Sequence, residues 1–89
     1  MTQLTYGQKA VGLTFNPSGD PRVQKLKELY AEIIDICNDG RRASVTHEIG
    51  IDGKTLALPV PDITHLWSIA ITQAMDAQMW AVKAATWKD

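Results

Sequence analysis

The sequence is poor in several residue types whose abundance would indicate particular functions. Its only cysteine, Cys37, cannot form an internal disulfide and does not make a metal site alone. The net charge of −1 lacks the basic excess that binders of long nucleic acids carry. No apolar run reaches the about 20 residues that cross a bilayer, and the N-terminus lacks the apolar core of a signal peptide. We therefore expect a cytoplasmic protein that binds neither membranes nor long nucleic acid, with Cys37 as a buried structural thiol.

The chain does contain enough apolar residues for one small domain. Of its 89 residues, 45% are hydrophobic, which predicts a single globular unit over residues 1–89. A chain of this size buries only a modest fraction of its surface, so self-association is an option from the outset.

Capping residues near the N-terminus predict a short first helix. Thr5 and Gln8 have the three-residue spacing of a capping box, which favours a helix over residues 6–13.

A long helix is predicted after the turn-forming sequence FNPSGDP. Asp20 is a good N-cap and Pro21 a good first helical residue, while Gly40 is a natural C-terminal stop. The apolar residues between them follow the three-and-four spacing of one helical face: Val23, Leu26, Leu29, Tyr30, Ile33, Ile34 and Cys37.

Residues 41–62 have a different composition and form a variable insert in this prediction. β-Branched residues flank an Asp-Gly-Lys sequence, which favours a β-hairpin over residues 45–58, with an irregular loop as the alternative.

The last predicted helix, residues 63–87, carries only Asp76 and Lys83 as charged residues, and apolar side chains surround it. A helix that is apolar all round is buried all round. Its length of about 37 Å exceeds the about 27 Å of the helix predicted to begin at Pro21 and to end before Gly40, which therefore cannot cover it. The predicted fold is mainly α, a short helix followed by a long antiparallel helical hairpin, assembled as a homo-oligomer.

Residues suited to catalysis are few. Glu28, Glu32 and Asp35 share one side of the long helix, at the spacing with which helical nucleotide pyrophosphatases hold Mg²⁺. Such enzymes need further acids from a second helix, and only Asp76 is available, so a solvated acidic face is the preferred interpretation. We expect no catalytic residue, no metal and no cofactor.

The loop before the long helix has features of an anion site. Its backbone amides at Ser18, Gly19 and the first helical turn are expected to be free, and a helix N-terminus favours anions. Asp20 as a cap would compete with a phosphate, so an ordinary loop and cap is the alternative. The aromatic and basic side chains around the loop are Tyr6, Phe15, Arg22, Lys25 and Lys27.

The segments YGQKAVGLTFNPSGDPRVQKLKELYAEIID and AITQAMDAQMWAVKAATW resemble the small phage proteins of the anti-CBASS and Thoeris anti-defence sponge family. The resemblance covers somewhat more than half the chain. It implies a protein of the infected bacterial cytoplasm that binds and sequesters cyclic nucleotide second messengers without cleaving them. It also implies a hexamer of helical hairpins, with dinucleotide pockets between protomers and trinucleotide sites where three protomers meet. Cyclic ADP-ribose isomers made by TIR enzymes are the alternative ligands.

The same resemblance implies the ligand-binding residues. An aromatic residue stacks on the cyclic dinucleotide and a lysine meets its phosphates; Lys27 matches that lysine best. With the loop, the predicted dinucleotide site comprises Tyr6, Phe15, Asn16, Ser18, Gly19, Lys25 and Lys27. The predicted trinucleotide site comprises Thr72 and Lys83.

Overall fold

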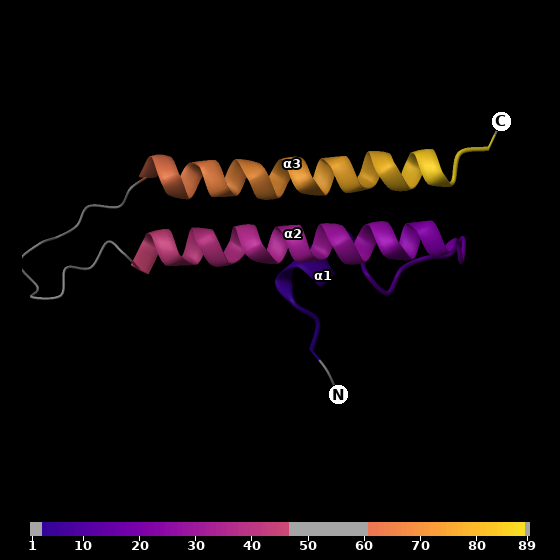
Figure 1. Cartoon of the computed structure of the whole chain (residues 1–89), viewed down its shortest axis with the longest axis horizontal. Coiled ribbons are helices and arrows are strands. Elements are labelled where there is room, and N and C mark those ends of the chain that lie inside the picture. Colours follow the sequence, from indigo (N-terminus) through magenta and orange to yellow (C-terminus); the bar gives the residue numbers. More distant parts are fainter. Residues whose placement is uncertain (1–2, 47–60, 89) are drawn as a thin grey trace, which may run out of the picture.

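The computed structural model describes residues 3–46 and 61–88, and it contains three helices. They are α1 (Tyr6–Val11), α2 (Pro21–Thr46) and α3 (Pro61–Ala85). Helices α2 and α3 lie side by side and antiparallel, and α1 packs mainly against α2 and to a smaller extent against α3 (Figure 1). The described residues contain no strand. The mainly α fold with a helical hairpin agrees with the prediction from the sequence.

Helix α1 begins at the predicted capping box. The Thr5 hydroxyl accepts from the backbone N–H of Gln8 at 3.1 Å, and the backbone N–H of Thr5 donates to the side-chain oxygen of Gln8 at 2.9 Å. The helix ends two residues before the predicted end because Gly12, at φ 64°, adopts the left-handed conformation that closes a helix.

Helix α1 is held close to α2 at Gly7. The Gly7 N–H donates to the carboxylate of Asp35 at 2.7 Å, and a Cβ built on Gly7 would lie 2.1 Å from the carbonyl oxygen of Ala31. Only a residue without a side chain allows this approach.

Helix α2 begins where the sequence predicts, at Pro21, but it does not stop at Gly40. It continues through Arg41 to Thr46, so the predicted stop and the predicted start of the insert are both wrong. A Cβ on Gly40 would lie 2.5 Å from the ring of Trp67, so this glycine gives room for a tryptophan of α3. Packing between the helices therefore accounts for a residue that local propensity assigns to a helix end.

The longer α2 also corrects the length argument for self-association. Helices α2 and α3 contain 26 and 25 residues, so each matches the other in length. The homo-oligomer remains a prediction, and a difference in helix length no longer supports it.

The core lies between the facing sides of the three helices. Ile34 is fully buried, and Cys37 is buried beside it, as expected. The other buried residues of this cluster are Val11, Ala31, Ile71 and Ala74.

The proposed β-hairpin falls largely outside the described residues. Of its span, Val45 and Thr46 are helical, as the last residues of α2, and residues 47–60 lie outside the described part of the chain. Among the described helices, none is long and apolar enough to cross a membrane.

Candidate anion-binding groove

The loop between α1 and α2 is held by its own polar groups. The Gly19 N–H donates to the Asn16 carbonyl at 3.1 Å, and the Ser18 hydroxyl to the Asn16 side-chain oxygen at 2.8 Å. The Asp20 N–H donates to the Ser18 hydroxyl at 3.1 Å, and the Arg22 N–H to the Asp20 carboxylate at 2.8 Å. The expectation that these amides are free is therefore wrong for Gly19 and for the first helical turn, whose N–H groups have partners within the loop. An anion seated directly on this helix end would have to displace them.

Asp20 and Arg22 form an ion pair at the same helix end. Arg22 Nη2 donates to Asp20 Oδ2 at 3.1 Å and also to the carbonyl of Ala85 at 3.1 Å, which ties the start of α2 to the end of α3. The side-chain hydrogen bond from Arg22 lowers the pKa of Asp20 below its usual value. The carboxylate therefore stays ionised at neutral pH, and its stabilising contribution is lost as the pH falls through the lowered pKa.

Lys27 has a structural role in this loop. It is 5% exposed, and its Nζ donates to the carbonyl of Gly12 at 3.0 Å and to the carbonyl of Phe15. The amine also lies 5.5 Å from the centroid of the Phe15 ring, which is 69% exposed. An ammonium has three donors, so two acceptors within the chain leave one donor for a ligand.

A groove between α1, α2 and α3 brings three lysines together. Lys9 of α1, Lys27 of α2 and Lys83 of α3 line an open hollow of about 530 Å³, with Gly12 and the buried Gln78. The residues that line it include no Asp or Glu. On a chain of net charge −1, this is a local concentration of positive charge.

Two further hollows adjoin the groove, and each has an exposed aromatic ring. One, of about 200 Å³, is lined by Phe15 and shares Lys27 with the groove. The other, of about 300 Å³, is lined by Trp80 and shares Lys83 with it. Together the three hollows place lysines between two aromatic side chains.

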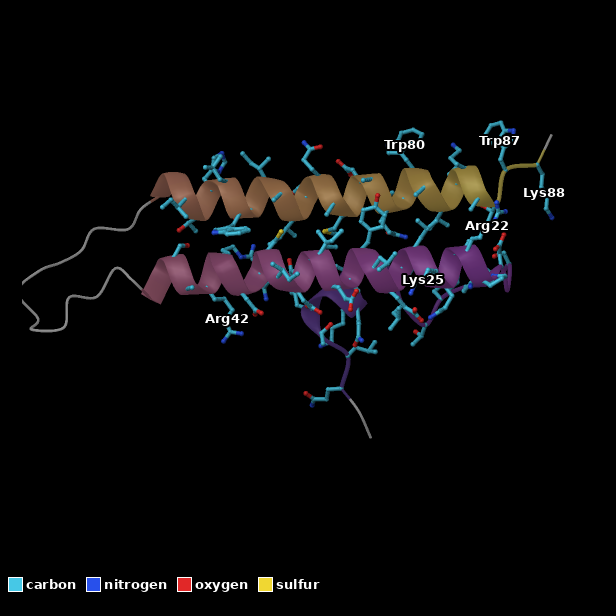
Figure 2. The ribbon with its side chains drawn as sticks, in the orientation of Figure 1. Arg22, Lys25, Arg42, Trp80, Trp87 and Lys88 are labelled. Carbon is cyan, nitrogen blue, oxygen red and sulfur yellow. The ribbon has the colours of Figure 1, made fainter. Side chains whose placement is uncertain are left out.

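Lys83 lies between two tryptophans of the α3 surface. Its Nζ is 5.6 Å from the centroid of the Trp80 ring and 5.9 Å from that of Trp87. Figure 2 shows both indoles projecting from α3 on the side away from α2. Both rings are exposed in the protomer.

Two predicted dinucleotide-site residues lie apart from the pair Phe15 and Lys27. The Tyr6 ring lies 5.5 Å from the guanidinium of Arg41, which is fourteen residues, about 21 Å, along α2 from Lys27. Lys25 lies two residues from Lys27, on nearly the opposite side of α2, in a hollow with Glu28, Glu32 and Asp35.

Thr72 and Lys83 do not meet within one protomer. Thr72 is exposed and donates to the carbonyl of Ser68 at 3.1 Å. It precedes Lys83 by eleven residues, three turns of α3 or about 16 Å.

Sequence reasoning missed Lys9 and Gln78 as groove residues. Lys9 lies in the last turn of a six-residue helix, and its position depends on how α1 docks on α2. Gln78 offered a signal, since an amide on the buried side of an otherwise apolar helix face is unusual.

The acidic residues suggested for Mg²⁺ binding are divided between two hollows: Glu28, Glu32 and Asp35 line one with Lys25, and Asp76 lines another. The carboxylate of Asp35 accepts the Gly7 N–H, and Asp76 lies on α3 beside Trp80 and Lys83. Within residues 3–46 and 61–88, no three His, Cys, Asp or Glu side chains are grouped so that they could hold a metal ion.

Comparisons with known proteins give no family for this chain. No protein-family model, no curated protein and no solved structure matches it.

Proposed function

We propose that this protein binds cyclic oligonucleotide signals in the lysine-lined groove and sequesters them without cleavage, as a phage counter-measure to CBASS-type defence. One observation carries the proposal: three helices each contribute a lysine, Lys9, Lys27 and Lys83, to one groove whose lining includes no acid. The resemblance of the sequence to cyclic nucleotide sponges supplies the ligand class.

The groove suits a ligand with two or three phosphates. Hydrogen bonds from ammonium groups to phosphate oxygens are charge-assisted, and each is roughly twice as strong as a neutral one. Lys9 and Lys83 are exposed at the groove, and Lys27 retains one donor. The volume of about 530 Å³ falls within the range of about 300–1,000 Å³ typical of small-molecule sites.

The flanking aromatic rings suit the bases of such a ligand. Phe15 and Trp80 lie in the two adjoining hollows, one beside Lys27 and the other beside Lys83. Stacking of a base on an aromatic side chain contributes about 1–3 kcal/mol and tolerates different bases. The arrangement favours small anions that carry bases over inorganic phosphate.

Sequestration acts by mass action and requires tight binding. A nanomolar dissociation constant corresponds to about −12 kcal/mol. The residues that line the groove include no carboxylate, histidine or hydroxyl group to activate water. This chemistry supports binding over hydrolysis.

A thermal-shift screen tests the proposal. Cyclic dinucleotides, cyclic trinucleotides and cyclic ADP-ribose isomers are added separately to the purified protein. Ligands that bind the folded state raise the melting temperature, and at 100 times Kd they add about 2.7 kcal/mol to stability. We expect at least one cyclic oligonucleotide to do so, and Lys9→Gln and Lys83→Gln to reduce the shift.

The matched control is Lys88→Gln. It removes the same charge from an exposed residue that lies at the C-terminal end of the chain and outside the groove lining (Figure 2). It should leave the shift unchanged. A response to cyclic ADP-ribose isomers alone would assign the protein to the Thoeris-type alternative, and no response to any ligand would contradict the proposal.

A further inference from the structure

A buried glutamine of α3 lines the lysine-lined groove. Gln78 is 5% exposed and lines the groove together with the three lysines. It follows the core residues Ile71 and Ala74 at intervals of three and four residues, so the three residues share one face of the helix. Positions of this kind usually hold apolar side chains. The packing of α3 on its neighbours therefore does not require an amide here.

The side-chain amide of Gln78 has no partner within the fold. In the part of the chain that the structure describes, no hydrogen bond joins this amide to another group. Every fully enclosed polar side-chain atom of the described residues does have a hydrogen-bond partner, so the Gln78 amide is not enclosed and opens on the groove that it lines. A carboxamide carries both an acceptor oxygen and an NH₂ donor. Both are available to a ligand in the groove.

The oxygen of this amide is the one side-chain acceptor of the groove lining. The lysines donate hydrogen bonds and do not accept them, and no other lining side chain has an oxygen or nitrogen atom. These other residues are Ala10, Val11, Gly12, Met79 and Val82. The oxygens of a phosphodiester accept hydrogen bonds from lysines but have no proton to give to Gln78 Oε1. A ligand that pairs every polar group of the groove therefore presents an O–H or N–H donor between its phosphates.

We propose that Gln78 binds a ribose hydroxyl of the cyclic nucleotide, so that the groove selects ribonucleotides over deoxyribonucleotides. This inference rests on the proposed function. The ribose joins successive phosphates, so its free hydroxyl lies between the groups that the lysines bind. The bases occupy the adjoining hollows with Phe15 and Trp80, which leaves the sugar beside Gln78. A hydroxyl is both donor and acceptor, as the amide is, and the 2′-hydroxyl is the group by which proteins distinguish RNA from DNA.

Titration calorimetry of the full chain with matched pairs of ligands tests this selectivity. Cyclic di-AMP, cyclic di-GMP and cyclic tri-AMP, all with 3′–5′ linkages, are each compared with the counterpart that lacks the 2′-hydroxyls. We expect a ribonucleotide to bind about tenfold more tightly than its deoxy counterpart, because the deoxy ligand buries the glutamine oxygen without a donor.

The variant that tests the residue is Gln78→Met. It keeps the length of the side chain and removes both hydrogen-bonding groups, so the Kd of the ribonucleotide should rise about tenfold while that of the deoxy ligand stays unchanged. The melting temperature of the free protein should not fall, because the fold loses no hydrogen bond. Gln73→Met is the matched control, since it makes the same change at an exposed position of α3 outside the groove lining. It should keep the wild-type preference for ribonucleotides.

The ratio of the two affinities separates this inference from the proposed function. A wild type that binds a ribonucleotide and its deoxy counterpart equally well would overturn the role of Gln78 while sequestration stands. So would a Gln78→Met variant that keeps the wild-type preference, because a merely structural glutamine would not change that ratio. A wild type that binds neither member of any pair would overturn the proposed function and this inference with it. If Gln78→Met does not fold, the wild-type ratio still decides.

Discussion

At the scale of single residues, Lys27 shows how one side chain can serve both the fold and the candidate site. Its burial and its hydrogen bonds to the carbonyls of Gly12 and Phe15 hold the loop against α2. The same position puts its remaining donor at the junction of the groove and the hollow that contains Phe15. Loss of this amine should therefore affect stability as well as affinity.

We expect Lys27→Met to lower the free energy of unfolding by about 1–3 kcal/mol. The substitution keeps a long unbranched chain but leaves the two loop carbonyls without their donor. Chemical denaturation measures the change. Lys25→Met serves as the control, because Lys25 is exposed on the other side of α2 and should change stability by less than about 0.5 kcal/mol. Equal losses from the two variants would contradict the structural role of Lys27.

Part of the candidate site could be predicted from the sequence because its geometry is local. Phe15 and Lys27 belong to one loop and the helix that follows it, and the structure brings them together. Tyr6, by contrast, lies at the far end of α1, and its position follows from the docking of Gly7 on α2. Lys9 and Lys83 line the same groove because α1 packs on α2 and α2 packs on α3. No local sequence pattern specifies these two packing contacts.

At the scale of helices, the sequence predicts the N-terminal ends of α1 and α2 correctly. The capping box of α1 and the Asp20-Pro21 start of α2 depend on neighbours within four residues, so the sequence reveals them. Gly40 was misread because its role depends on Trp67, which belongs to another helix. Without knowledge of that contact the sequence predicts too short an α2. The argument for self-association from helix length depended on that short prediction.

We expect Gly40→Ala to destabilise the protein, although alanine is the better helix former by about 1 kcal/mol. The added Cβ would lie 2.5 Å from the Trp67 ring, and overpacking of this kind costs about 1–3 kcal/mol. Thermal unfolding measures the effect. In a Trp67→Leu background, which removes the ring, the same substitution should be neutral or stabilising. A stabilising Gly40→Ala in the wild type would contradict the close packing of α2 and α3.

At the scale of the whole molecule, the helices form a thin layer with two different faces. The Cα trace measures 12 Å along its shortest axis. The lysine groove lies where α1 packs on the hairpin, whereas exposed aliphatic residues such as Ile33 and Ile36 lie on another side of α2.

A protein that binds a cyclic oligonucleotide and keeps it intact should yield that ligand unchanged when the bound fraction is recovered. The protein is incubated with a mixture of cyclic di- and trinucleotides, freed of unbound ligand by gel filtration and denatured, and the released nucleotides are identified by mass spectrometry. We expect intact cyclic nucleotide in stoichiometric amount from the wild type, and a reduced amount from Lys83→Gln. Linear products, or no nucleotide at all, would contradict this expectation.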